Sequence, residues 1–233
     1  NKNLSVKMAK FEKIIIENDE NLLIKKFISL FKQKIRKKKK GRFSFVLTGG
    51  DSPIKLYKKI AKIKNINWRK IDFFIGDERF VNENSKNSNF KMCKKYLIDR
   101  IKISNKQIYK ISTANKSLKE ATLDYEKKIK KYFLNKKISF DLTLLGVGED
   151  GHIASLFNKN IAIKTNKSVD FVKRKDFFRI TLTLKSLNNS KSIFLWMPGS
   201  KKINIAEKIL TDNKKKYPAS HLLGKEKILF HCN

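Results

Sequence analysis

Cysteine is scarce in this chain of 233 residues. Its two cysteines, Cys93 and Cys232, lie far apart in the sequence. They form neither a disulfide framework nor the closely spaced pairs of ligands that a zinc site requires. We therefore expect the protein in a reducing compartment, and the cytoplasm is the default.

Long hydrophobic runs are also missing. No apolar stretch approaches the roughly 20 residues that a membrane-spanning helix needs. The start of the chain lacks the apolar block, followed by small residues, that marks a secretory signal. We expect a soluble protein with no membrane partner.

Proline and glycine are few, with 3 and 9 copies, and no Pro, Gly and Ser-rich linker interrupts the chain. There is no internal repeat and no low-complexity segment. The 17 phenylalanines supply ample apolar surface for a core. We expect one α/β domain over residues 1–233.

Acidic residues are also few. The chain has 21 Asp and Glu but 55 Lys and Arg, so its formal net charge is +34. The lysines are scattered along every predicted helix, and only "KQKIRKKKKGR" (residues 32–42) is a dense block. This block ends a predicted helix, where cations complement the helix dipole. We favour a solvated helix end, and a non-catalytic basic protein that binds nucleic acid is a distant alternative.

Short apolar runs alternate with longer amphipathic stretches, which predicts strands alternating with helices. The predicted strands lie at 43–50, 71–78, 138–148, 177–184, 192–199 and 227–233, and the predicted helices at 20–38, 54–63, 89–100, 117–133 and 200–210. This order predicts an α/β fold with a mostly parallel sheet covered by helices on both faces, in a Rossmann-like arrangement. Ligands bind such sheets beyond the carboxyl ends of the strands, so the loops there are the candidate sites.

A glycine-rich loop, "TGGDSP", lies at the end of the first predicted strand. Gly49 and Gly50 permit backbone angles and close approaches that other residues resist. Ser52 is a good helix N-cap and Pro53 suits the first helical position, so a helix should begin here, with free amides that could bind phosphate. An ordinary turn is the alternative, and the carboxylate of Asp51 must point away if a phosphate binds.

Three consecutive charged residues, Asp77, Glu78 and Arg79, lie at the end of the second predicted strand in "FFIGDERFV". Charges at this position are costly to bury unless they are paired. We expect them to pair with one another or with a ligand. An Asp–Arg ion pair that braces the loop is the alternative to a binding role.

The segment "LLGVGEDGHIASLF" (residues 144–157) places three glycines, two acids and a histidine in one loop. Gly146, Gly148 and Gly151 satisfy the G-x-G-x-x-G pattern of dinucleotide-binding loops. Such a loop should precede a clean second strand that ends in an acid, but the segment before Asp170, "NKNIAIKTNKSV", is too polar for a buried strand. A nicotinamide-binding role is therefore rejected.

His152 is the chemically distinctive residue of this loop, because it lies beside Glu149 and Asp150. Imidazole has an ordinary pKa near 6.5 and can exchange protons at neutral pH. A structural histidine is the alternative. The other two histidines, His221 in a loop and His231 in the terminal strand, lack such neighbours.

Six segments of the chain form a recognisable series. They read "LTGGDSP", "GDERFV", "NSN", "GVGEDGHIASLF", "RITLTLKSLN" and "MPGSKK". In order and spacing they resemble the 6-phosphogluconolactonase family of the pentose phosphate pathway, and the likeness runs from about residue 43 to residue 202. The resemblance implies the sugar-phosphate isomerase/deaminase fold, which this family shares with glucosamine-6-phosphate deaminase.

The related deaminases are the second alternative. Their loop would read "GHIAFNEP" and supply a glutamate for ring opening, whereas this chain has Phe157 at that position. The chain departs from the lactonase pattern at two places. Asp51 and Ser52 replace the usual Ser-Thr pair, and Asn158 replaces a common proline.

The resemblance implies hydrolysis of 6-phospho-D-glucono-1,5-lactone to 6-phospho-D-gluconate, without a cofactor or a metal. His152 is the expected general base, Asp150 or Asp77 would orient its ring, and the backbone amides from Gly148 to Gly151 would receive the oxyanion. The remaining residues expected to bind the substrate or its phosphate are Gly49, Gly50, Ser52, Arg79, Arg179 and Lys201. The phosphorylated lactone is the expected partner, with no specific nucleic acid, and the protein is expected to be a monomer or a weak homo-oligomer.

Overall fold

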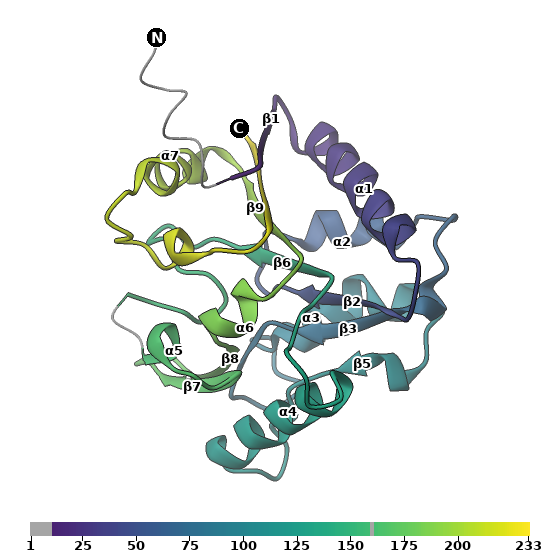
Figure 1. The fold of residues 1–233 in the computed structure, drawn as a ribbon, viewed down its shortest axis with the longest axis vertical. Helices are drawn as coiled ribbons and strands as arrows, with labels where there is room; N and C mark the ends of the chain where they lie inside the picture. Colours follow the sequence, from purple (N-terminus) through teal and green to yellow (C-terminus); the bar gives the residue numbers. More distant parts are fainter. Residues whose placement is uncertain (1–10, 159–160) are drawn as a thin grey trace.

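The computed structural model describes residues 11–158 and 161–233 (Figure 1). Within these residues a seven-stranded parallel sheet has the order β1-β10-β9-β6-β2-β3-β5. Its strands are β1 (Lys13–Glu17), β2 (Phe43–Leu47), β3 (Ile71–Ile75), β5 (Ile108–Tyr109), β6 (Leu142–Gly146), β9 (Ser192–Pro198) and β10 (Glu226–Cys232). The predicted α/β fold with a mostly parallel sheet is confirmed.

Helices connect these strands, as the alternating pattern predicts. They are α1 (Glu20–Lys37), α2 (Ile54–Ile60), α3 (Asn89–Tyr96), α4 (Leu118–Tyr132), α5 (Ile161–Lys164), α6 (Leu184–Asn188) and α7 (Ile203–Thr211). Side chains set several of the boundaries. Asp19 caps α1 through the amide of Asn21 at 2.6 Å, and Ser117 and Glu120 form a capping box at the start of α4.

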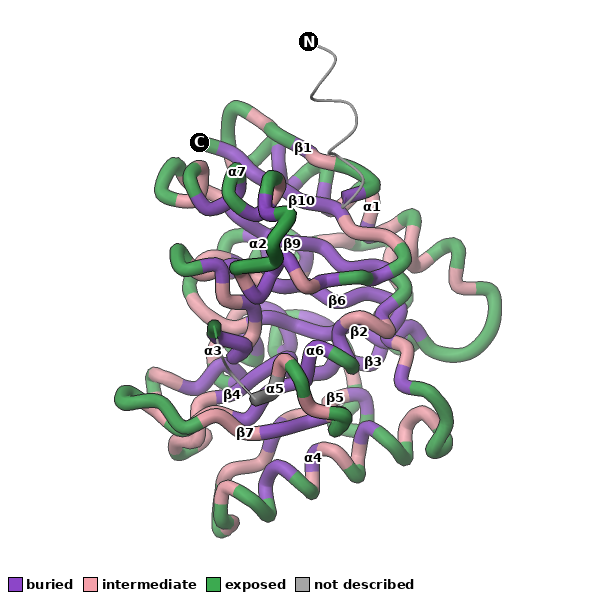
Figure 2. The backbone as a smooth tube through the Cα atoms, turned by 60° about the vertical axis from the view of Figure 1, so that its left-hand side comes forward, coloured by how far each residue is buried: buried purple, intermediate pink, exposed green. Residues whose placement is uncertain are grey.

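Helices cover both faces of the sheet, which the alternation of side chains along β3 makes plain. Phe73 contacts Phe45 at a centroid distance of 6.1 Å, and Phe45 packs at 5.0 Å against Phe31 of α1. The next residue, Phe74, points to the opposite face and packs at 4.9 Å against Tyr132 of α4. Figure 2 shows the buried backbone running through β9, β6, β2 and β3 between these helices.

A second, smaller sheet of three antiparallel strands has the order β4-β8-β7. Its strands are β4 (Asp77–Arg79), β7 (Val169–Lys173) and β8 (Phe178–Leu182). Gly76 joins the two sheets, because its amide donates to Leu47 O at 2.9 Å and its carbonyl accepts from Leu182 N at 2.8 Å. The predicted strand 71–78 is therefore divided between the sheets, and the predicted strand 177–184 belongs to the smaller one.

Other boundaries also differ from the prediction. The predicted strand 138–148 pairs only over β6, and the predicted helix 89–100 ends at Tyr96. The strands β1, β5 and β7 were not predicted, and neither were the short helices α5 and α6. All three strands lie at the edge of a sheet, and each has five residues or fewer, so none of them gives the long apolar run of a central strand.

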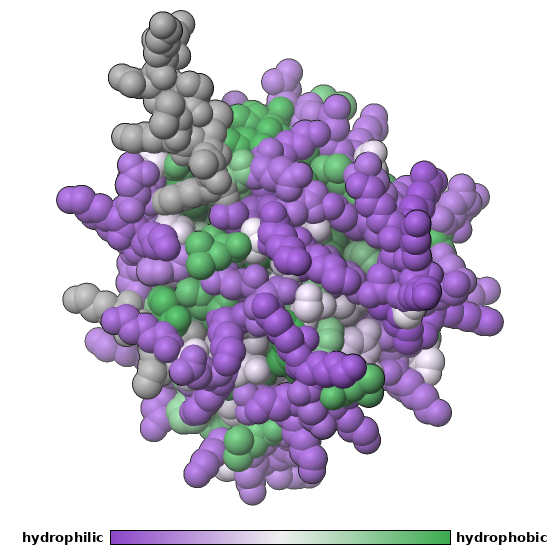
Figure 3. Space-filling model, viewed as in Figure 1, coloured by the Kyte–Doolittle hydropathy of each residue, from purple (hydrophilic) through white to green (hydrophobic). Residues whose placement is uncertain are grey.

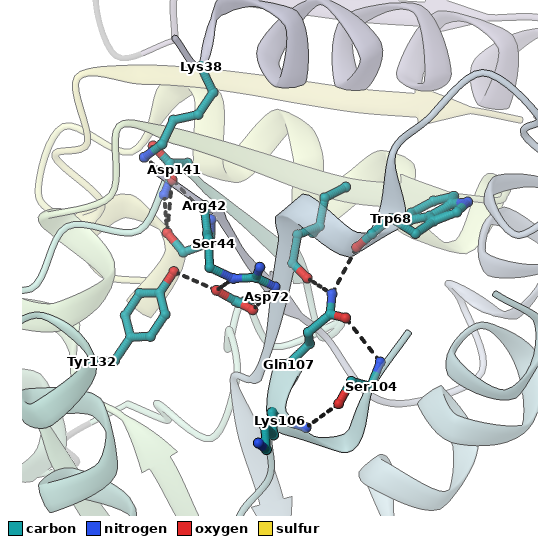
Figure 4. Close-up of polar contacts among 11 residues, drawn as sticks. Lys38, Arg42, Ser44, Trp68, Asp72, Ser104, Lys106, Gln107, Tyr132 and Asp141 are labelled. Carbon is teal, nitrogen blue, oxygen red and sulfur yellow. Dashed lines mark hydrogen bonds and ion pairs between the residues drawn. The ribbon is translucent and has the colours of Figure 1, made fainter. Parts of the chain in front are cut away.

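Ion pairs hold the amino-terminal ends of the central strands (Figure 4). Asp141 accepts hydrogen bonds from Lys38 Nζ at 2.7 Å and from the amide of Ser44 at 3.0 Å. Arg42 binds Asp72 through two hydrogen bonds of 2.6 Å each. These contacts fix one end of the sheet, and the loops at the opposite, carboxyl end can serve a binding site.

The face of the molecule in Figure 3 is mostly hydrophilic. Figure 3 shows hydrophilic side chains over most of one face, with small hydrophobic areas between them. Among the described helices, none combines the length and the apolar character that a bilayer crossing demands.

Candidate active site

A cavity lies at the carboxyl ends of the strands, where the three loops of the sequence analysis meet β8. The residues that line it are Thr48, Gly49, Gly50, Asp51, Ser52, Asp77, Arg79, Asn89, Gly146, Val147, Gly148, His152, Ala154 and Arg179. Eight of the eleven predicted site residues are among them. The exceptions are Asp150, Gly151 and Lys201.

The glycine loop packs tightly against α3. A Cβ on Gly49 would lie 2.0 Å from Cγ of Asn89, so a larger residue at this position would displace the asparagine. The helix after the loop begins at Ile54 with Pro53 as its N-cap, and no side chain makes a capping hydrogen bond there. The prediction that Ser52 caps this helix is wrong, because Pro53 already has helical backbone angles in the preceding turn. Ser52 lines the cavity instead.

Asp77 and Arg79 both line the cavity, because alternate residues of β4 point to the same side. They make separate contacts among the described residues. Asp77 accepts from Ser155 Oγ at 2.6 Å, and Arg79 donates to the carbonyl of Asn87 at 2.8 Å. Asn89 Nδ2 also donates to the carbonyl of Asp77 at 2.8 Å. The alternative of an Asp–Arg ion pair bracing this loop is therefore wrong.

Glu78, between these two residues, fixes the start of α3. Its carboxylate accepts hydrogen bonds from the amides of Asn89 at 2.7 Å and Phe90 at 2.8 Å, and from Ser88 Oγ at 2.9 Å. Burial raises the pKa of Glu78 to about 7, although these hydrogen bonds act in the opposite direction. Glu78 therefore holds α3, and with it Asn89, against the cavity.

Arg79 and Arg179 are register partners on the antiparallel strands β4 and β8. Like charges opposite one another destabilise a sheet. The Nε atoms of both arginines are buried and have no hydrogen-bond partner. Arg179 pairs with Asp176, whereas no described carboxylate pairs with Arg79. The cavity thus combines positive charge with unused donors, which suits an anionic ligand.

His152 is held by Asp150 through a contact of 2.5 Å between Nδ1 and Oδ1. Partial burial would raise the pKa of Asp150, but the hydrogen bond from the imidazole brings it below its usual value. Of the two acids expected to orient the ring, Asp150 is the one in contact, since Asp77 is bound by Ser155. The contact at Nδ1 leaves Nε2 as the ring nitrogen that can react.

Gly148 makes room for this imidazole, because a Cβ there would lie 2.1 Å from Nδ1 of His152. The amide of Gly148 donates to the carbonyl of His152, and the amide of Gly151 donates to the carbonyl of Gly148, each at 2.9 Å. Both amides are therefore engaged within the loop. The oxyanion role expected for the segment has no free donor at these two positions.

Phe157 packs beside the imidazole, with 4.6 Å between the ring centroids. Cζ of Arg174 lies 3.9 Å from the centre of the phenylalanine ring, and Cζ of Arg179 lies 5.4 Å from it. The residue that stands at the position of the deaminase glutamate is thus an apolar support for His152.

Lys201 lies outside the cavity. It is exposed in a short 3₁₀ turn, Ser200–Lys202, that leads into α7. The other two histidines do not line the cavity either, and Nδ1 of His231 lies 2.7 Å from the carbonyl of Met197. Among the described residues, no group of three or more His, Cys, Asp and Glu is arranged to hold a metal ion.

Among the residues at or beside the cavity, Asn89, Phe157, Arg174 and Asp176 make contacts that the sequence analysis did not anticipate. Asn89 stands in "NSN", one of the segments that carried the resemblance. Its contact with Asp77 joins α3 to β4, and no sequence pattern predicts such a contact. Arg174 and Asp176 lie in a charged turn that looks like ordinary surface in the sequence.

Comparisons with known proteins agree with this arrangement. The family model of glucosamine-6-phosphate isomerases and 6-phosphogluconolactonases matches residues 18–230. The 6-phosphogluconolactonase of Thermotoga maritima is 34% identical over 216 residues, which are 88% of this chain and 93% of that protein. The 6-phosphogluconolactonase of a Nostoc species is 33% identical, with 79% of each chain covered.

Solved structures give the same result. The crystal structure of the Thermotoga maritima 6-phosphogluconolactonase has a TM-score of 0.83 at 32% identity, and the match covers 94% of this chain and 99% of that one. The 6-phosphogluconolactonase from Plasmodium vivax has a TM-score of 0.81 at 27% identity, with 94% and 89% covered. The chain therefore belongs to the glucosamine-6-phosphate isomerase and 6-phosphogluconolactonase family.

Proposed function

We propose that this protein hydrolyses 6-phospho-D-glucono-1,5-lactone to 6-phospho-D-gluconate in the oxidative pentose phosphate pathway. The observation that carries the proposal is that His152, bonded to Asp150, shares one cavity with Arg79 and Arg179. A proton acceptor and a pair of cations match a substrate that has an ester carbonyl and a phosphate group. The lactonase names of the relatives support the same reaction.

His152 acts as the general base in this proposal. Its Nε2 takes a proton from water as the water oxygen bonds to C1 of the lactone, and Asp150 stabilises the imidazolium that forms. The tetrahedral intermediate then breaks its bond to the ring oxygen, which takes the proton back from the imidazolium. The products are an open-chain hydroxyl group and a carboxylic acid, which ionises.

The arginines bind the phosphate and so hold the ester carbonyl near the base. Guanidinium groups bind phosphate oxygens through charge-assisted hydrogen bonds, and such anchoring makes the attack effectively intramolecular. Gly50 and Ser52 line the same cavity and extend the phosphate site, but Asp51 between them also lines the cavity, so its carboxylate has to turn away from the phosphate. We assign no substrate contact to Lys201, because it lies outside the cavity.

The residues of the cavity do not favour the deaminase alternative, although the matching family model covers both kinds of enzyme. Its ring opening requires an acid at the position of Phe157, and this side chain has no proton to exchange. The ring is 7% exposed and packs against His152, so it leaves no space there for another acidic group.

A lactone-hydrolysis assay, corrected for the spontaneous reaction, tests the proposal. We expect the wild-type protein to accelerate formation of 6-phosphogluconate and His152→Ala to lower kcat by roughly 10²- to 10⁴-fold with little change in KM. His221→Ala is the matched control, since His221 does not line the cavity, and it should retain wild-type rates. Normal turnover by His152→Ala would refute the general-base role, and release of ammonia from glucosamine 6-phosphate would indicate the deaminase.

A further inference from the structure

The turn between β7 and β8 brings another arginine, Arg174, close to Arg179. Asp176 in this turn makes an ion pair with Nη2 of Arg179, and its Oδ1 lies 3.8 Å from Nε of Arg174. Both guanidinium groups also lie over the ring of Phe157, at 3.9 Å for Arg174 and 5.4 Å for Arg179. The two arginines therefore share one carboxylate and one aromatic ring.

The group formed by Arg174, Arg179 and Asp176 carries a net positive charge. Two guanidinium groups face one carboxylate, and Nε of Arg179 is buried with no partner. The side chain of Arg179 is 11% exposed and water can hydrate little of it, whereas that of Asp176 is 48% exposed. An ion pair of such an exposed carboxylate contributes little stability, so Asp176 can turn into solvent at small cost.

We propose that Asp176 is an internal counterion, which holds Arg174 and Arg179 together until the phosphate group of the substrate replaces it. A phosphate monoester carries nearly two negative charges and three acceptor oxygens, so it can neutralise both guanidinium groups where one carboxylate cannot. Arg174 is then a phosphate ligand in addition to Arg79 and Arg179. Asp176 weakens the binding of phosphorylated ligands by competing with them. This inference rests on the proposed function, because it takes the phosphate of the lactone as the competing anion.

Steady-state kinetics with a phosphorylated and an unphosphorylated substrate test whether phosphate replaces Asp176. Asp176→Asn should lower KM for the phosphorylated lactone by about two- to fivefold, the range that corresponds to one exposed ion pair. The KM for unphosphorylated D-glucono-1,5-lactone should not change in this variant. Arg174→Ala should raise KM for the phosphorylated lactone several-fold. The matched control is Lys175→Ala, which removes an exposed positive charge from the same turn and should change KM little.

Binding of inorganic phosphate, measured by calorimetry, keeps this inference separate from the proposed reaction. We expect Asp176→Asn to bind phosphate more tightly than the wild type, whether or not either protein hydrolyses the lactone. A higher KM or weaker phosphate binding in Asp176→Asn would show that Asp176 only positions Arg179, and would overturn the proposal. Unchanged values would overturn it as well, because then no competition exists. A wild-type protein that fails to accelerate lactone hydrolysis would count against the proposed function alone.

Discussion

Two neighbours with different chemistry hold the imidazole of His152. Asp150 contacts Nδ1 at 2.5 Å and fixes which ring nitrogen faces the reaction, while Phe157 supports the flat side of the ring. The carboxylate also stabilises the positive charge that the ring gains on taking a proton. Loss of Asp150 should therefore slow the chemical step more than it weakens substrate binding.

The variant Asp150→Asn tests this division of roles. An amide at this position can still form a hydrogen bond to the ring, but it has no charge to stabilise the imidazolium. We expect kcat to fall by roughly ten- to a hundredfold, with KM within about twofold of the wild type. Initial rates of lactone hydrolysis over a range of substrate concentrations would show this. The adjacent Glu149→Gln is the control, and equal rates for both variants would contradict the role of Asp150.

Individual site residues were predictable where they follow a strand directly. Asp77, Arg79 and His152 were identified in this way, since charged or glycine-rich segments after apolar runs lie at the binding edge of a parallel sheet. Asn89 and Asp176 were not, because each acts through a contact with another element. Lys201 was proposed from the resemblance alone, and local sequence offered no means of judging its distance from the cavity.

At the scale of elements, the junction between β4 and α3 positions three of the residues that line the cavity, Asp77, Arg79 and Asn89. Glu78 is buried at this junction, with 3% of its surface exposed, and it accepts hydrogen bonds from the first two amides of α3. These hydrogen bonds fix the position of Asn89 on α3 relative to Asp77 and Arg79 on β4. The stability of this junction depends on the protonation state of Glu78.

We expect this dependence to appear in the free energy of unfolding. An unfolded chain releases the proton of Glu78 near pH 4.5, whereas the folded protein keeps it up to about pH 7. Between these values the folded protein binds more protons, so stability falls as the pH rises, by up to about 3 kcal/mol, and is constant above this window.

Urea unfolding of the wild type and Glu78→Gln at about pH 5 and about pH 8 would measure this term. The difference between the two pH values should be smaller in Glu78→Gln than in the wild type. Glu83→Gln is the control, because Glu83 lies in the loop that follows β4 but is partly exposed and paired with Lys110. An identical pH dependence in Glu78→Gln and the wild type would show that Glu78 ionises normally.

The positions of the strands were easier to predict than which strands pair with one another. The run 71–78 was predicted as one strand that spans β3 and most of β4, but the break at Gly76 depends on hydrogen bonds to Leu47 and Leu182 in two different sheets. In the same way "FFRITLTL" was correctly read as a strand, yet nothing in it indicates that it pairs with β4. Strand pairing is a contact between distant segments, and periodicity along one segment does not encode it.

At the scale of the whole molecule, the formal charge of +34 produces a field that attracts anions. Raising the ionic strength from about 0.01 M to about 0.1 M shortens the screening length from about 30 Å to about 10 Å. We expect kcat/KM for the phosphorylated lactone to fall several-fold over this range. The neutral, unphosphorylated lactone should be insensitive to salt. Equal sensitivity of both substrates would mean that salt acts on the protein and not on the attraction between protein and substrate.

The global architecture followed from the sequence because it depends on a repeated pattern. Apolar runs that alternate with amphipathic stretches have few stable arrangements other than a parallel sheet between helices. The edge strand β1 was missed for the opposite reason. Its residue Ile16 is 67% exposed, and the segment carries charges at both ends, so it has no clear pattern of its own.

The position of β10 between β1 and β9 bears on how the protein is made. The ribosome synthesises the chain from its N-terminus. The strand β1, which ends at Glu17, therefore cannot pair until β10, which begins at Glu226, has been made. Until that segment leaves the exit tunnel, β1 and β9 each present an unpaired backbone edge. Closure of the sheet is therefore a late event in biosynthesis, and nascent chains that stall before β10 would be the ones that need chaperones.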